Sequence, residues 1–148
     1  MKYLVQILVV FVVISLSATY AQKNFGIGVI LGEPTGLSAK LYTGSNNAFD
    51  FAAAWSFKGN GNLLLQADYV WHSSLTRASS GELMLYYGIG GRVIFQDDPR
   101  FGARIPVGLD YQFTSAPIDI FLELVPILDF VPSTNFNLGG GIGVRFWL

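Results

Sequence analysis

Apolar and polar residues alternate along most of the chain after residue 24. The alternation is clearest over 136–148, where the even positions are apolar or glycine and the odd positions include Asn137, three glycines and Arg145. A period of two places successive side chains on opposite faces of an extended chain. This stretch is therefore predicted to be a β-strand with one apolar and one polar face.

Eight segments of this kind are separated by short clusters of Gly, Pro, Asn and Ser. The predicted strands are 25–31, 36–43, 48–57, 62–72, 81–95, 102–113, 118–131 and 136–147. Most connections have hairpin length, so neighbouring strands should be antiparallel. The longest connection is SSLTRASS at 73–80. Pro106 and Pro126 each remove a donor from the strand ladder, so we expect a bulge or a local bend at both.

Charged residues are restricted to one face of these strands. After position 21 the chain has eight basic and ten acidic residues. Seven of them fall in turns or at the start: Lys23, Glu33, Lys58, Arg77, Asp97, Asp98 and Arg100. The eleven on predicted strands all fall on the polar face: Lys40, Asp50, Asp68, Glu82, Arg92, Arg104, Asp110, Asp119, Glu123, Asp129 and Arg145.

This distribution fits two kinds of eight-stranded antiparallel up-and-down barrel. An exported soluble, lipocalin-like barrel would turn its apolar face inward around a hydrophobic ligand. A transmembrane barrel has the opposite arrangement, with an apolar band toward lipid and a polar interior. A charge on the lipid face would cost roughly 2–4 kcal/mol near the midplane, and the apolar face has none. A secretory pattern at the start of the chain, the many aromatic residues of the apolar face and the glycines of the polar face favour the second kind. We therefore predict an all-β transmembrane barrel.

Aromatic residues on the apolar face are predicted to form two girdles at the membrane surfaces. If both termini lie on the periplasmic side, one girdle contains Phe25, Phe49, Tyr69, Trp71, Tyr111, Phe113 and Phe146. The other contains Trp55, Phe57, Phe95, Phe130 and Phe136.

The first 21 residues have the pattern of a secretory signal peptide. Lys2 precedes an apolar run from Leu4 to Leu16, and small residues lead to a cleavage point after Ala21. The run is shorter than the ~20 residues that a membrane-spanning helix needs. The predicted organisation is a signal peptide at 1–21 and one barrel domain at 22–148.

Composition excludes several classes of function. The chain is 51% hydrophobic and only 13% charged, with a net charge of -1 and no cysteine. Such a charge gives no electrostatic basis for binding nucleic acid, and the lack of cysteine excludes disulfides and thiolate metal sites. No cofactor or metal is predicted. Asp97 and Asp98 could at most contribute carboxylates to a calcium site, and nothing else in the sequence supports one.

Several stretches resemble a family of short bacterial outer-membrane β-barrel proteins. They are GEPTGLSAKLY, AFDFAAAWSF, LYYGIGGRV, RIPVGLDYQF, IDIFLELVPILDF and GGGIGVRFWL. That family is similar to the OmpA-like transmembrane domain, and its function is uncharacterised. The resemblance implies export to the bacterial outer membrane, contact with its lipids and insertion by the barrel assembly machinery.

The predicted interior charges form the main candidate site. Eight strands leave an interior that side chains just fill, so we expect a plug of paired charges. The alternative is a narrow channel, which would prefer cations because acids are in excess.

His72, Ser74 and Glu82 are the only candidate catalytic set. A His-x-Ser sequence with a nearby Glu resembles the outer-membrane lipid A deacylases, and a serine nucleophile with a histidine base is sound acyl-transfer chemistry. However, strand parity turns His72 toward the interior, away from a lipid substrate. The expected function is therefore non-enzymatic: a monomeric protein of the outer membrane with a structural or envelope-interaction role.

Overall fold

The computed structural model describes residues 3–10, 24–33, 35–56 and 61–148, without the side chains of Glu33 and Ser56. The expected cleavage point after Ala21 and the expected girdle residue Phe57 lie outside these ranges. Residues 3–10 are helical and exposed. No helix in the described ranges is both long and apolar enough to cross a membrane.

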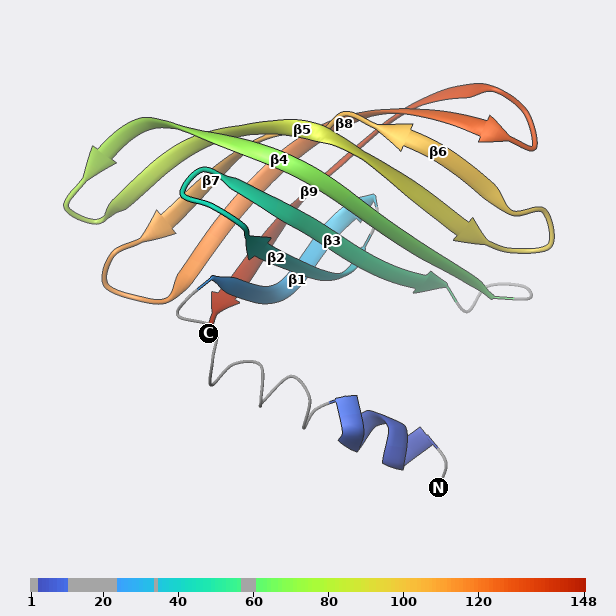
Figure 1. The fold of residues 1–148 in the computed structure, drawn as a ribbon, viewed down its shortest axis with the longest axis horizontal. Coiled ribbons are helices and arrows are strands. Elements are labelled where there is room, and N and C mark those ends of the chain that lie inside the picture. Colours follow the sequence, from blue (N-terminus) through green and yellow to red (C-terminus); the bar gives the residue numbers. More distant parts are fainter. Residues whose placement is uncertain (1–2, 11–23, 34, 57–60) are drawn as a thin grey trace.

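The rest of the described chain is an all-β fold, which confirms the predicted class (Figure 1). Nine antiparallel strands follow one another: β1 Phe25–Glu33, β2 Gly36–Tyr42, β3 Asn47–Ser56, β4 Asn62–Ala78, β5 Gly81–Phe95, β6 Arg100–Arg104, β7 Val107–Phe113, β8 Ile118–Val131 and β9 Asn135–Trp147. Six strands have bounds within two residues of the prediction, and the exceptions lie at β4 and at β6 and β7.

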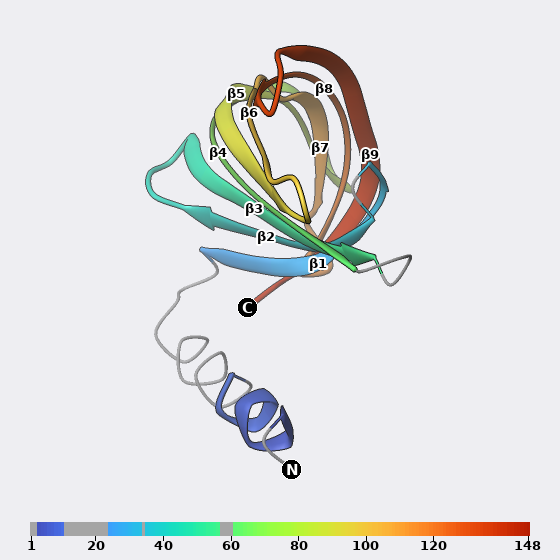
Figure 2. The same ribbon diagram turned by 90° about the vertical axis from the view of Figure 1, so that its right-hand side faces the viewer.

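The strand pairings form a closed circuit. Each of β1 to β4 pairs with its neighbours in sequence, β4 pairs with β5, and β9 pairs with both β8 and β1. The short strands β6 and β7 lie end to end between β5 and β8 and pair with both. Figure 2 shows the strands arranged around a common interior. Each strand of a closed circuit has a partner on both sides over at least part of its length, so no strand forms a free sheet edge.

The predicted strand 102–113 is divided because two prolines lie side by side. Ile105 donates its N–H to the Pro126 carbonyl oxygen at 3.0 Å, and Gly88 donates to the Pro106 carbonyl at 3.0 Å. Neither proline has an N–H to return. Two neighbouring ladders therefore each lose a hydrogen bond at the same place, and β6 ends at Arg104.

Of the two expected distortions, the bulge is wrong at these prolines, whereas the local bend stays a prediction. Arg104 pairs with Ile127 and Val107 with Leu124, so the register of β6 and β7 on β8 does not change across the gap. Register shifts occur instead between Phe101 and Gly102 and between Ser74 and Thr76.

The expected long connection at 73–80 was also wrong. β4 continues to Ala78, and only Ser79 and Ser80 form the turn. β5 begins at Gly81 and offers β4 a partner over this whole length, with Ala78 opposite Gly81. Arg77 therefore lies on a strand, as does Arg100 at the start of β6.

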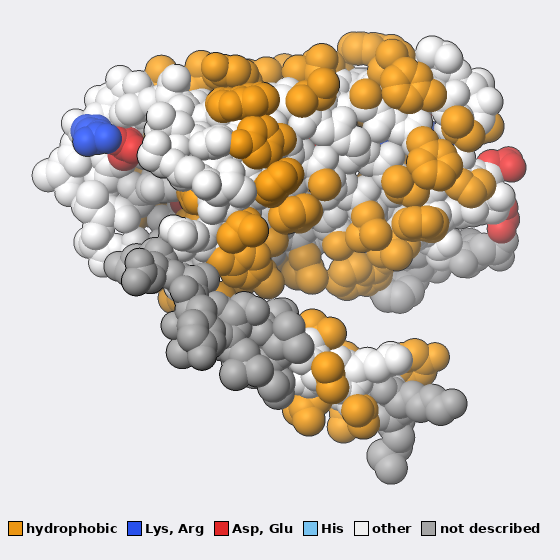
Figure 3. Space-filling model, viewed as in Figure 1, with side chains coloured by type: hydrophobic (Ala, Val, Ile, Leu, Met, Phe, Trp, Pro, Cys, Tyr) orange, Lys and Arg blue, Asp and Glu red, His pale blue; other side chains and the backbone are white. Residues whose placement is uncertain are grey.

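The two faces of the sheet differ sharply in exposure. The outward face is apolar and exposed, with Ile89 60%, Leu124 57% and Leu122 55% accessible. Charged residues such as Lys40, Asp119 and Arg145 are buried on the other face. On the side drawn in Figure 3, apolar side chains form a band over the wall, with charged side chains near its two ends.

The expected girdle aromatics that the structure describes are exposed or partly exposed. Phe49, Trp55, Trp71, Phe95, Phe130, Phe136 and Phe146 are exposed, whereas Phe25, Tyr69, Tyr111 and Phe113 are partly buried. Phe49, Tyr69 and Trp71 form edge-to-face contacts with ring centroids 5.0 Å apart. Trp71 extends this row to Tyr87 at 6.3 Å, a residue that the sequence analysis did not include.

Candidate functional site

The candidate site is the group of charged side chains inside the strand circuit. All eleven charged residues expected on the polar face have buried or partly buried side chains, with Glu82 the most accessible at 24%. They come from eight strands, β2 to β9. Alternate residues of a strand point to the same face, and each of these residues lies on the face that holds the other buried side chains of its strand.

Arg145 on β9 is the centre of the largest cluster. Its Nη1 lies 2.9 Å from Asp50 Oδ1, and its Nη2 lies 2.8 Å from Asp119 Oδ2. The guanidinium carbon is 4.0 Å from the centre of the Phe121 ring. Trp147 donates its indole N–H to Asp119 Oδ1 at 2.9 Å. One cation thus joins two carboxylates from different strands, which is the fork geometry that suits arginine.

Lys40 on β2 is fully buried beside this cluster. Its Nζ lies 3.5 Å from Asp110 Oδ2 and 3.7 Å from Asp50 Oδ2. The same ammonium lies 4.5 Å from the centre of the Tyr86 ring and donates a hydrogen bond to His72 Nε2 at 2.7 Å. Lys40 and Arg145 together face three carboxylates, so the cluster keeps an acidic excess.

A second group lies around Arg104 on β6. Arg104 Nε donates to Asp68 Oδ1 at 2.9 Å, Nη1 bonds to the Gln66 side-chain oxygen, and Nη2 lies 4.0 Å from Glu123 Oε1. Tyr86 donates its hydroxyl to Glu123 Oε2 at 3.1 Å. These contacts connect β4, β5, β6 and β8 across the interior.

A third group lies toward the end of the strand circuit where β8 finishes and β9 begins. Arg92 donates to both oxygens of Asp129, at 3.1 Å from Nε and 2.6 Å from Nη2. Asn137 adds a hydrogen bond to Asp129 Oδ2 at 3.0 Å. Buried charges are stable only when they are paired and hydrogen-bonded in this way.

Glycines leave room for the larger interior side chains. A Cβ at Gly90 would collide with Asp68 Oδ1, and one at Gly108 would collide with the Tyr86 ring. Neither pair could be predicted from the sequence, because both depend on the register between strands.

The centre of the interior has almost no free volume. A cavity of about 10 Å³ lies among Asp50, Gln66, Asp68, Glu123 and Arg145. That is about the space that one water molecule needs. The charged side chains that line this cavity therefore leave little free space between them.

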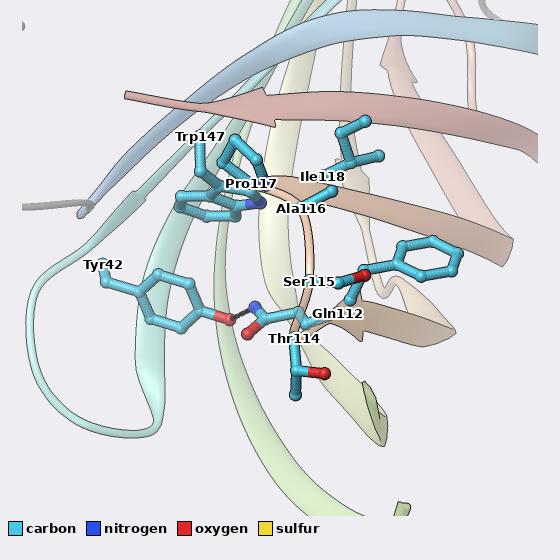
Figure 4. A pocket seen from close by; sticks show the side chains of 9 residues that line it. Tyr42, Gln112, Thr114, Ser115, Ala116, Pro117, Ile118 and Trp147 are labelled. Atoms are coloured by element: carbon cyan, nitrogen blue, oxygen red, sulfur yellow. Dashed lines mark hydrogen bonds between the residues drawn. The ribbon is translucent and has the colours of Figure 1, made fainter. Parts of the chain in front are cut away.

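A larger cavity of about 450 Å³ opens at the end where the described strands β1 and β9 begin and finish (Figure 4). Tyr42, Gln112 and Trp147 line it together with the turn 114–117 between β7 and β8. These three residues were predicted to lie on strands but not in a site. Each of the three lies on the polar face of its predicted strand. That is the only signal in the sequence that could have indicated this position.

The candidate catalytic residues are not assembled for acyl transfer. Ser74 donates to Glu82 Oε2 at 3.2 Å, but His72 bonds to other groups. His72 Nδ1 must donate to the Asn46 carbonyl at 2.9 Å, because a carbonyl only accepts, and Nε2 then accepts from Lys40. Neither ring nitrogen is available to a serine. Glu82 is held at the mouth by an ion pair with Arg77 rather than within the interior network.

The described residues contain no group of three or more His, Cys, Asp or Glu side chains arranged to hold a metal ion. Asp97 and Asp98 lie exposed in the turn between β5 and β6.

Comparison with protein-family models, with curated proteins and with solved structures gives no match for this chain.

Proposed function

We propose that this chain is a non-enzymatic β-barrel protein of the bacterial outer membrane, with its interior plugged by its own charged side chains. Its role is structural or lies in interactions within the envelope. The observation that carries this proposal is the division between the faces: charges such as Lys40 and Arg145 are buried inside, and the outward face is apolar and exposed.

The exposed apolar wall supports a lipid environment. Soluble monomers rarely expose contiguous apolar patches larger than a few hundred Å². Here exposed Leu, Ile, Val and Phe side chains follow one another across every long strand, among them Leu31, Ile89, Leu122 and Phe146. Lipid tails solvate such a surface without penalty, and a closed strand circuit satisfies the backbone hydrogen bonds that a bilayer cannot. These points also weigh against a soluble barrel with an apolar ligand inside, because the interior is charged.

The small size of the central cavity supports a plugged interior rather than a conducting channel. A conducting path needs continuous room for an ion and some water, whereas the central cavity is about 10 Å³. Arg104 and Arg145 cross the interior and bond to carboxylates on other strands. Opening a path would separate buried ion pairs, which typically costs about 3–5 kcal/mol when one partner is lost.

The remaining parts of the proposal follow from the resemblance to short outer-membrane barrel proteins. In this proposal residues 1–21 direct export, the barrel assembly machinery inserts the chain, and outer-membrane lipids surround a monomer. The closing strand β9 ends with Phe146 and Trp147. Phe146 is exposed and would contact lipid, whereas Trp147 is buried against Asp119.

Membrane fractionation tests the proposal. The full chain, expressed with its first 21 residues, should sediment with the outer membrane and stay there through carbonate and high-salt washes. Its gel migration should change with heating, because a closed barrel resists detergent until it is heated. Release into the soluble fraction by carbonate would contradict the membrane proposal.

A further inference from the structure

The cavity near the start of β1 and the end of β9 has the size and chemistry of a small-ligand site. Its volume of about 450 Å³ lies within the roughly 300–1,000 Å³ that ligand pockets occupy. Its walls come from separate strands: Tyr42 ends β2, Gln112 lies near the end of β7, and Trp147 ends β9. The turn 114–117 forms the remaining wall (Figure 4).

Two aromatic rings provide flat apolar surface in this cavity. The Tyr42 and Trp147 rings have centroids 5.3 Å apart and planes inclined by 37°. The Trp147 indole N–H is engaged by Asp119 at 2.9 Å, which fixes the orientation of the ring. The indole therefore offers the cavity a rigid apolar surface and no free donor.

Uncharged polar groups stand beside these rings. Gln112 donates one N–H to the Tyr42 hydroxyl oxygen at 3.0 Å. An amide has a second N–H and an oxygen, and the tyrosine hydroxyl can still donate. Ser115 adds a hydroxyl from the turn.

The lining excludes two classes of ligand. No charged side chain is among the described residues that line the cavity, so a charged ligand would lose water without gaining an ion pair. A purely apolar ligand would bury the second N–H and the oxygen of the Gln112 amide without partners, and an unsatisfied buried polar group typically costs about 1–3 kcal/mol. A flat ring that carries hydroxyl groups can contact the aromatic rings with its face and form hydrogen bonds with the polar groups through its hydroxyls.

We propose that this cavity, formed by Tyr42, Gln112, Trp147 and the turn 114–117, binds a neutral sugar ring. The ring stacks its C–H face against the aromatic pair, and its hydroxyls exchange hydrogen bonds with Gln112 and Tyr42. This site lies beside the interior plug, to which Trp147 is joined through Asp119, and it does not depend on the placement of the chain in a membrane.

Tryptophan fluorescence tests the proposal on the whole protein in a zwitterionic detergent that has no sugar headgroup. Trp55→Phe and Trp71→Phe remove the two exposed tryptophans, which leaves Trp147 as the reporter. Maltotriose and triacetylchitotriose are titrated separately to distinguish a plain from an acetamido sugar. A saturable change with either one supports the site.

Variants locate the binding. Gln112→Ala and Tyr42→Phe should each weaken binding, with at least a tenfold loss for Gln112→Ala, while heat-modifiable migration verifies the fold. Tyr87→Phe is the matched control, because Tyr87 is exposed on the outward face. The proposal is overturned if neither sugar gives a saturable change, if both site variants bind as tightly as the parent, or if a trimer of glucuronic acid binds more tightly than the neutral sugars.

Discussion

Arg145 Nη2 lies 2.8 Å from Asp119 Oδ2, and both side chains are almost completely buried. The same guanidinium contacts Asp50, which lies 95 positions away in sequence and on a strand separated from β9 by β1 and β2. This one cation connects β3, β8 and β9 through the interior. The strands are therefore held together by ion pairs in the interior as well as by the backbone hydrogen bonds between them.

Replacing Arg145 should destabilise the protein strongly. Arg145→Leu leaves Asp50 and Asp119 buried without their main cation, so the free energy of unfolding should fall by about 3–5 kcal/mol. Urea titration in lipid vesicles measures this. Arg77→Leu is the control, because the Arg77 side chain is itself 78% exposed where it pairs with Glu82, and exposed pairs contribute about 0–1 kcal/mol. Equal losses for the two variants would contradict the bracing role.

A charge on the outward face should distinguish lipid from water as the surrounding medium. Leu122→Arg replaces a side chain that is 55% exposed near the middle of β8. In a bilayer the unfolding free energy should fall by roughly 2–4 kcal/mol, whereas in water an exposed arginine is nearly neutral. Thr134→Arg in the exposed turn before β9 should have little effect in either medium. A neutral result for Leu122→Arg in vesicles would argue for the soluble alternative.

Neighbouring glycines should respond differently to the same substitution. Gly90→Ala pushes a methyl group into Asp68 and the backbone of Ala67, so it should destabilise by about 1–3 kcal/mol. At Gly91 the nearest atom to a new Cβ is the Gly102 carbonyl oxygen at 3.4 Å. Gly91→Ala should therefore be neutral or slightly stabilising. Thermal unfolding of both variants makes the comparison, and the reverse order would disprove the interior position of Gly90.

The wild-type protein should not conduct ions in discrete steps. Planar-bilayer recordings of the purified chain are expected to show no unitary openings, because the central interior is filled by side chains. Regular single-channel steps with cation preference would instead establish the narrow-channel alternative.

Ser74→Ala should leave lipid A unchanged. Ser74 bonds to Glu82, while both ring nitrogens of His72 are occupied by Asn46 and Lys40. Mass spectrometry of lipid A from cells that express either form should give the same acylation pattern. A loss of deacylated species in the variant would revive the hydrolase hypothesis.

The sequence alone determined the strands and their two faces. A period of two is a local property, because each side chain points opposite to its neighbour whatever the partner strand is. The positions of Asp119 and Arg145 on one face, and of Leu122 on the other, could therefore be read directly from the chain. Glycine, proline and asparagine clusters marked most turns for an equally local reason.

Only the tertiary structure decided which interior groups meet. The pairing of Arg145 with Asp50 depends on the register of every strand between them, and a shift of one residue would turn a side chain to the other face. The break before Val107 likewise needs Pro106 and Pro126 at the same level of adjacent strands. The cavity between Tyr42, Gln112 and Trp147 arises for the same reason, because strands far apart in sequence become neighbours only when the circuit closes.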